Sequence, residues 1–283
     1  MAAGDIDWTD PQFLSAINTS LTATAKCRGA FKTISQDLGA TTVTVPTIAP
    51  GSPIAYGPDQ VESAVQVYVD VNVDDQQHAG DRPTVVNLIS TGAAALGALE
   101  DRAIVEGVPA PAGGAPVIAG RGLRQRAIPH GSLRPRQGAA LTQIAARANA
   151  RPTGADILRA VATAMAALEN ANRPGAYALI IQNELLSILN LPPVSGAAPE
   201  LNAVTALIGG NQIVGTSALS RAANRNDVCG ILFRYDPPAV DLVQTQLPAL
   251  IVLGKNAGLT NLRIEESIAV RVLDPTAVHY LEY

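Results

Sequence analysis

Valines alternate with polar or aromatic residues between residues 61 and 74. The alternation has a period of two, which is typical of a β-strand with one buried face. At about 3.3 Å per residue such a strand is roughly 43 Å long, more than twice the usual length. With a shorter strand at residues 41–45 and a bend rich in proline and glycine at 46–58, it predicts a long two-stranded arm. Because an isolated hairpin is marginally stable in water, we expect this arm to project from the body and lie on a neighbouring subunit.

The surface of this chain is predicted to be poor in charge. Its 283 residues are enough for one large domain or two subdomains with a substantial core. Charged residues make up 16% of the chain, against roughly 25% in ordinary soluble proteins, and the lysines are Lys26, Lys32 and Lys255. Such a surface is poorly suited to a free monomer, so we expect much of it to face other protein.

Several classes of protein are disfavoured by the sequence. No apolar run approaches the roughly 18 residues that a membrane-spanning helix needs, so we expect no membrane segment. The first residues show no basic region followed by an apolar one, which argues against secretion. We therefore expect the protein in the cytoplasm, with Cys27 and Cys229 as buried free thiols. A net charge of −4 without a basic tail gives no electrostatic footprint for general nucleic-acid binding.

The residues that usually carry catalysis or bind metals are few and scattered. The histidines, His78, His130 and His279, are far apart in the sequence, and none is close to a cysteine. The chain has no Gly-x-Ser-x-Gly elbow, no phosphate loop ending in Gly-Lys-Ser/Thr and no Cys-x-x-Cys pair. We predict no catalytic residue, no bound metal and no cofactor. Two carboxylates just before His78 are interpreted as part of a solvated turn, with cation binding as the alternative.

Five arginines between residues 121 and 136 form the main basic cluster of the sequence. Interleaved proline and glycine place these arginines on a loop, and no aromatic residue among them could stack on a nucleic-acid base. We interpret this segment as a subunit contact or a solvated loop, with polyanion binding as the alternative.

Two long helices are predicted in the first part of the chain. The first begins after Asp10, and its apolar stripe continues to Leu38. The second carries Leu99 on its apolar face and places Glu100 and Asp101 off that face. Beyond these two, a capped helix, a buried strand and short helices lead to a tail of consecutive strands.

Four short segments, in fixed order, carry a resemblance to a known family. They are Arg28-Gly-Ala-Phe31-Lys32-Thr33, Glu100-Asp101-Arg-Ala-Ile104-Val-Glu-Gly107, Gly175-Ala-Tyr177-Ala-Leu-Ile-Ile181 and Ile264-Glu-Glu266-Ser-Ile-Ala-Val270-Arg-Val-Leu-Asp-Pro275-Thr-Ala277. They resemble segments of the encapsulin shell proteins, bacterial nanocompartment subunits built on the bacteriophage HK97-type capsid fold. The chain departs from that family in a longer segment at 109–152 and in a reduced motif at 237–243. These departures leave a phage or prophage major capsid protein of the same fold as the alternative.

The resemblance implies a mixed α+β fold of the HK97 capsid type. It implies a non-enzymatic shell subunit that self-assembles into a closed icosahedral compartment, a virus-like particle in the cytoplasm. A ferritin-like or peroxidase cargo would be enclosed through a terminal targeting peptide, whereas the phage alternative would enclose DNA in a virion. The implied parts are an N-terminal helical arm (1–38), an extended loop (39–75), a peripheral domain with the spine helix (76–152 and 228–283) and an axial domain (153–227).

The resemblance also implies a cargo site. In the family, the N-terminal helix faces the interior and helps to form the groove that takes the cargo's terminal peptide. The matching apolar candidates here are Ile17, Leu21, Phe31 and Ile34. Packing of these side chains under the spine helix is the alternative.

A pore is the second implied site. In the family, a loop of the axial domain lines the opening at the five-fold vertex, and the matching loop here is residues 191–200. Its candidate pore residues are Pro192, Pro193, Ser195 and Glu200. Because Glu200 is the loop's one ionisable side chain, we expect a nearly neutral pore that selects solutes by size.

Overall fold

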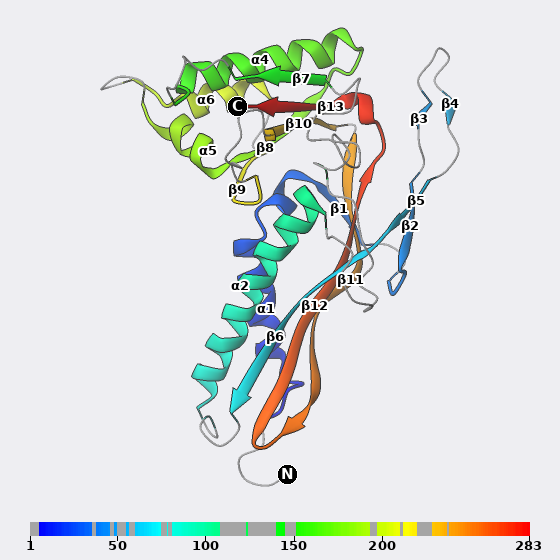
Figure 1. Cartoon of the computed structure of the whole chain (residues 1–283), viewed down its shortest axis with the longest axis vertical. Helices are drawn as coiled ribbons and strands as arrows, with labels where there is room; N and C mark the ends of the chain where they lie inside the picture. The colour runs from blue at the N-terminus through cyan, green and yellow to red at the C-terminus, as the bar shows by residue number, and fades with distance from the viewer. Residues whose placement is uncertain are drawn as a thin grey trace.

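The computed structural model of the chain shows two bodies, each built on a β-sheet that carries helices (Figure 1). The lower body is long and narrow, and the upper body holds the C-terminal strand. The described residues are 6–35, 38–45, 48–49, 55–56, 60–74, 78, 81–107, 123, 140–144, 151–192, 197–209, 212–219, 228–236 and 238–283.

The lower body is built on a four-stranded sheet in the order β1-β11-β12-β6. Its centre is the long antiparallel hairpin of β11 (Val240–Asn256) and β12 (Leu259–Val272). β6 (Val65–Asp74) pairs antiparallel with β12, and β1 (Lys32–Ser35) pairs parallel with β11. The valines of β6 are more buried than the residues between them, so the period of two read from the sequence is the period of the buried face.

Two helices cover one face of this sheet (Figure 1). α1 (Pro11–Thr24) begins at Asp10, whose side chain accepts a hydrogen bond from the Gln12 amide at 2.8 Å. α2 (Arg82–Glu106) packs against β6 and against α1. Gly97 allows the two helices to approach closely, because a Cβ at this position would collide with the last turn of α1.

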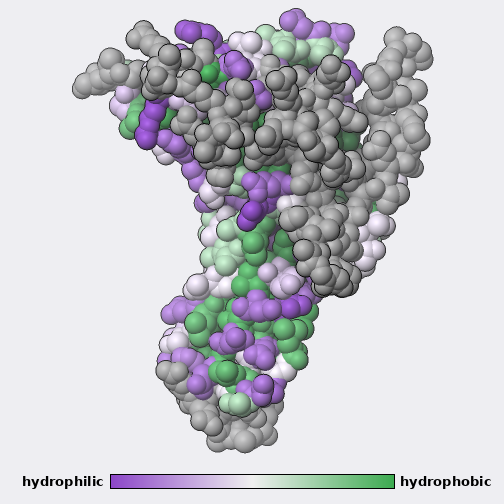
Figure 2. Space-filling view, viewed as in Figure 1, coloured by the Kyte–Doolittle hydropathy of each residue, from purple (hydrophilic) through white to green (hydrophobic). Residues whose placement is uncertain are grey.

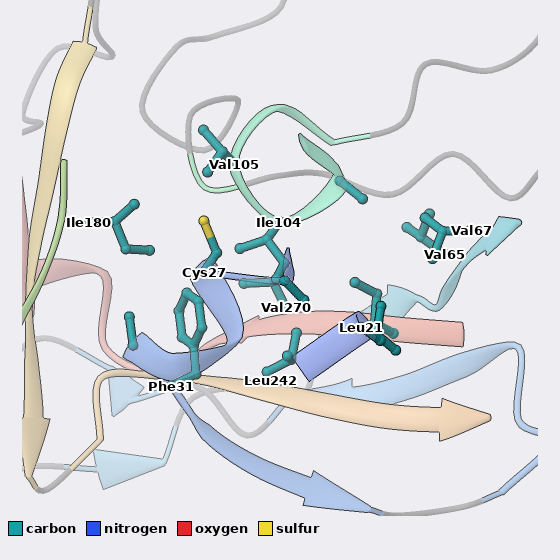
Figure 3. Close-up of a cluster of buried hydrophobic side chains, with 14 of the residues drawn as sticks. Leu21, Cys27, Phe31, Val65, Val67, Ile104, Val105, Ile180, Leu242 and Val270 are labelled. Carbon is teal, nitrogen blue, oxygen red and sulfur yellow. The ribbon is translucent and has the colours of Figure 1, made fainter. Parts of the chain in front are cut away.

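The largest hydrophobic core lies where the helices and both sheets meet (Figure 3). Leu21 from α1, Ile104 from α2 and Leu242 from β11 belong to this core. Phe31 stacks on Phe233 of the upper sheet, with ring centroids 5.2 Å apart and planes 12° apart. The two bodies therefore share one continuous core.

The upper body is a five-stranded sheet in the order β7-β13-β10-β8-β9, covered by three helices. The second hydrophobic core of the molecule lies in this upper body and is formed largely by three helices and one strand, α4, α5, α6 and β8, whose bounds follow. The strands are β7 (Ala140–Gln143), β8 (Ala176–Gln182), β9 (Ile213–Thr216), β10 (Val228–Asp236) and β13 (Val278–Glu282), and the helices are α4 (Gly154–Asn170), α5 (Asn183–Asn190) and α6 (Glu200–Leu207). Short 3-10 helices are η1 (Cys27–Ala30) and η2 (Pro275–Ala277).

The first helix is shorter than its apolar stripe predicts. It ends at Thr24, and the chain continues through η1 into β1, so the prediction of a helix as far as Leu38 is wrong beyond Thr24. The reason is long-range pairing, because β11 offers β1 a parallel partner from Lys32↔Asp241 to Ser35↔Gln244. The expectation of buried free thiols is confirmed for both cysteines.

The long alternating strand is divided in the structure. β5 (Gln60–Ser63) belongs to the arm, whereas β6 lies inside the four-stranded sheet, where β12 pairs with it from Val65↔Ile268 to Asp74↔Leu259. Only the part of the predicted arm that precedes β6 therefore lies outside the four-stranded sheet. The sheet that contains β8 and β9, both within the predicted axial domain (153–227), also contains β7, β10 and β13. The division of the chain into domains stays a prediction.

Candidate functional site

A two-stranded arm leaves the body where β6 begins. β2 (Thr42–Val45) pairs antiparallel with β5, and further out β3 (Ile48–Ala49) pairs with β4 (Ala55–Tyr56). Figure 1 shows the arm on the right, rising beside the upper body. Within the described part of the chain, neither of these two ladders joins another sheet. The arm is thus a separate ribbon with backbone edges available for contact with another molecule.

The base of the arm is fixed firmly to the long hairpin. Arg271 donates to both carboxylate oxygens of Asp241, at 2.8 and 2.6 Å, and its Nη1 lies 3.5 Å from the carbonyl oxygen of Thr44 in β2. This bidentate pair is almost fully buried, so it holds the arm's first strand in a defined place. A small apolar cluster beside it consists of Val43, Ala64, Val243 and Ala269.

Three of the four candidate cargo residues lie inside the subunit. Ile17 and Leu21 are fully buried on the face of α1 that packs under α2, and Phe31 is buried against Phe233. This packing accounts for their apolar character without any ligand. Ile34 is different, because it lies on β1, an edge strand of the sheet, and is 38% exposed. Ile34 is therefore the member of the set that a bound peptide could contact without unfolding the subunit.

The candidate pore loop connects α5 to α6 at one end of the upper body. Pro192 and Glu200 border it, and Glu200 is the first residue of α6. Pro193 and Ser195 lie outside the described residues. Glu200 packs against the start of α4, where a Cβ on Gly154 would lie 2.7 Å from Glu200 Cγ. The stem of Glu200 is thus held by α4.

A buried ionic cluster joins three elements that are far apart in the sequence. Arg28 of η1 donates from Nε and Nη2 to the two carboxylate oxygens of Glu100, at 2.8 and 2.9 Å, and Nη2 also donates to Glu266 Oε2 at 2.7 Å. Neither glutamate side chain is exposed. Burial, with the nearby charge of Glu266, raises the pKa of Glu100 to about 8, although Arg28 opposes the shift.

The neighbouring residue Asp101 makes a second buried contact to the same segment. Its Oδ1 accepts from the Cys27 amide at 2.7 Å, and its Oδ2 accepts from the Thr216 hydroxyl of β9 at 3.1 Å. Burial raises the pKa of Asp101, and these hydrogen bonds oppose that rise. Successive carboxylates at the end of α2 therefore hold η1 against both sheets.

The sequence pattern predicts Glu100 and Asp101 off the apolar face of their helix, and this prediction is wrong because both are buried. A signal for the contact was present in the sequence. The four segments that carry the family resemblance include Arg28, Glu100-Asp101 and Glu266, and the structure brings three of those segments together in one cluster.

No group of three or more His, Cys, Asp or Glu side chains that could hold a metal ion occurs in the described ranges. Among the helices that the structure describes, none is both long enough and apolar enough to cross a bilayer. The contacts described above that define the candidate site are an arm, its anchor and a buried ionic cluster.

Comparison with known proteins gives a result at the level of the fold. No protein-family model matches the chain, and no curated protein sequence matches it. Solved structures do match: a virus-like particle from Pyrococcus furiosus has a TM-score of 0.71 at 15% identity, covering 98% of this chain and all (100%) of the other. This chain has the HK97-type capsid fold.

Capsid structures from other sources share the fold over nearly their whole length. The capsid of an empty GTA particle matches with a TM-score of 0.61 at 14% identity, covering 92% of this chain and 90% of the other. The capsid of Myoviridae phage XM1 matches with a TM-score of 0.60 at 12% identity, covering 92% and 91%. The α+β architecture expected from the resemblance is confirmed.

Proposed function

We propose that this HK97-type chain is a non-enzymatic subunit of a closed protein shell. The observation that carries the proposal is the full-length match to structures described as a virus-like particle and as capsids. The arm supports it, because a ribbon that, among the described strands, joins neither sheet has backbone edges for a neighbour to pair with or cover.

Exposed apolar side chains on the lower body support the same proposal. Figure 2 shows apolar residues over the region where Figure 1 places α1, α2 and β6. A surface of this kind is rare on monomers and typical of faces that other protein covers. The large exposed apolar residues of the lower body include Leu14, Leu99, Tyr68, Leu247, Ile251, Val252, Leu253 and Leu259.

Within this class, we propose an icosahedral nanocompartment of the encapsulin type that encloses a cargo protein in the cytoplasm. The resemblance of the four sequence segments supports it, and so does the coverage of the Pyrococcus furiosus virus-like particle from end to end. The cargo would be a ferritin-like or peroxidase enzyme whose terminal peptide contacts Ile34. The loop between α5 and α6 would line a nearly neutral pore.

The alternative is a phage or prophage major capsid protein that encloses DNA. The specific observation in its favour is the similarity to a GTA capsid and a phage capsid over about nine-tenths of each chain. In this case the arginines between residues 121 and 136 become candidates for contact with the enclosed polyanion. All of these arginines lie outside the described residues.

The contents of the native particle distinguish the two proposals. Particles would be purified from cells that naturally carry the gene, treated with nuclease and protease, and then opened for nucleic-acid quantification and mass spectrometry. The compartment proposal expects a second protein in fixed ratio to the shell and little protected nucleic acid. Protected double-stranded DNA of uniform length, with no second internal protein, would instead establish the capsid alternative.

A further inference from the structure

Two buried carboxylates share one arginine where η1, α2 and β12 meet. Full ionisation of Glu100 and Glu266 places two negative charges against the single positive charge of Arg28, so one buried charge has no counterpart. A buried charge without a partner is strongly unfavourable, whereas one proton bound by the two carboxylates makes the cluster neutral.

The hydrogen bonds show the same imbalance between donors and acceptors. Nη2 of Arg28 serves both Glu100 and Glu266, and Gln244 Nε2 approaches Glu266 Oε2 at 3.4 Å. The other carboxylate oxygen of Glu266, Oε1, is buried and has no hydrogen-bond partner among the described residues. Among the described residues, the donors that face the cluster are therefore too few for two ionised carboxylates.

Among the described residues that face Glu100, Arg28 is the one positively charged group. The titratable and charged groups that face Glu100 are Arg28 and Cys27 from η1, Glu266 from β12 and the adjacent Asp101 on α2. Burial, followed by the charge of Asp101, raises the pKa of the Cys27 thiol well above its ordinary value, so this thiol is neutral and adds no further negative charge to the cluster.

We propose that the Arg28–Glu100–Glu266 cluster is a proton-operated clasp that fixes η1 to α2 and β12. The closed clasp holds one proton, whereas Glu100, once exposed by lifting of η1, ionises near the ordinary glutamate pKa of about 4.3. Since η1 connects α1 to β1, opening of the clasp loosens the hold on the N-terminal segment while the rest of the sheet stays paired.

The direction of the pH dependence follows from the number of protons that the closed and the open state bind. Above the ordinary glutamate pKa and up to the raised pKa of about 8, the closed state binds one proton more than the open state. Acidification therefore favours the closed clasp. Raising the pH increases opening by roughly tenfold per pH unit within this window, and the increase levels off once both states have lost the proton.

The two cysteines provide the test, because Cys27 lies in the clasp and Cys229 lies buried in the second core. The intact assembly would be treated with a small thiol-alkylating reagent between pH 6.5 and 9.5, and the labelling rate of each cysteine measured by mass spectrometry. The ratio of the Cys27 rate to the Cys229 rate cancels the intrinsic pH dependence of thiolate chemistry. We expect this ratio to rise from pH 6.5 to about 8 and then level off.

Single substitutions test whether the two glutamates of the cluster hold the proton. Glu100→Gln removes one carboxylate and should give a ratio that does not change with pH, and Glu266→Gln should do the same if the first variant fails to fold. Glu265→Gln, on the same strand but paired with Gln246, is the matched control and should keep the wild-type profile. A wild-type ratio that is flat from pH 6.5 to 9.5, or a rise that persists in Glu100→Gln, would overturn the proposal.

Discussion

His279 lies buried in β13, with Nε2 2.7 Å from Thr142 Oγ1 and with Nδ1 lacking a hydrogen-bond partner among the described residues. Burial lowers the pKa of His279 to about 4. An unfolded chain binds a proton at this residue near pH 6.5, so acid favours unfolding. His279 thus ties the stability of the β7–β13 pair to pH in the opposite direction to Glu100.

For His279, the expected outcome is a loss of stability between about pH 6.5 and about 4 that reaches up to about 1.4 kcal/mol per pH unit. His279→Gln should lack this part of the acid dependence, while His78→Gln, at a half-exposed position, should retain it. The measurement is the free energy of unfolding against pH for the three proteins. Equal acid slopes in the wild type and His279→Gln would show that His279 is not the group responsible.

Ile34 is the candidate cargo residue that can be changed without removing a buried side chain from the hydrophobic core. Ile34→Glu should weaken cargo capture at least tenfold, because burial of an isoleucine contributes about 1.5–3 kcal/mol and each 1.4 kcal/mol is tenfold in affinity. Leu38→Glu is the matched control, since Leu38 is also exposed and apolar but is not a candidate. Cargo content per particle is measured by mass spectrometry. Unchanged loading in Ile34→Glu would remove this residue from the site.

Two neighbouring residues of α2 show that residue type alone does not predict which side chains of this helix are buried. Leu99 is apolar and was expected on the buried face, yet it is 41% exposed, whereas Glu100 is charged and fully buried. Helical periodicity assigns faces from residue type alone. The partners that make burial of Glu100 tolerable, Arg28 and Glu266, come from distant parts of the chain, so local pattern could not reveal them.

At the scale of elements, the contact between α1 and α2 depends on Gly97. A Cβ at Gly97 would lie 2.3 Å from Thr24 Oγ1 and 2.8 Å from the backbone nitrogen of Ala25. A backbone atom cannot move aside as the end of a flexible side chain can. Gly97→Ala should therefore lower the free energy of unfolding by about 1–3 kcal/mol, despite the better helix propensity of alanine. Gly29→Ala is the control, because its Cβ meets no atom nearer than 3.8 Å. Equal unfolding free energies for these two variants would contradict the close packing.

The arm is the element on which assembly is expected to depend. Val45 and Gln60 are paired, so replacement of residues 46–59 by Asn-Gly would close β2 and β5 with a tight turn and remove the outer ribbon. We expect this variant to keep the subunit fold, seen by circular dichroism, and to form small oligomers in analytical ultracentrifugation. Particles of the wild-type size would show that the outer arm does not hold the shell together.

Elements were predictable from sequence where their pattern is local. The alternating valines of β6, the capped starts of α1 and α4 and the buried strand β8 all follow from short-range spacing and capping residues. The division between arm and sheet was not predictable, because β12, which captures β6, lies almost 200 residues further along the chain. The strand β1 was not predictable either, because its residues continue the apolar helical stripe and its partner strand, β11, lies far along the chain.

At the scale of the whole molecule, the central claim is that the subunit is built to be buried in a shell. Exposed apolar side chains on the lower body, a ribbon outside both sheets and a low charge content all describe a surface that needs neighbours. The fold match is to a virus-like particle and to capsids, and it is the reason why we propose a closed shell for this chain.

The most direct test is cryo-electron microscopy of this chain produced alone and purified without any partner protein. We predict hollow particles of uniform diameter with icosahedral symmetry, in which the arm of each subunit lies on an adjacent subunit. A monodisperse monomer or small open oligomer at concentrations where related shells are complete, with the subunit fold intact, would contradict this prediction.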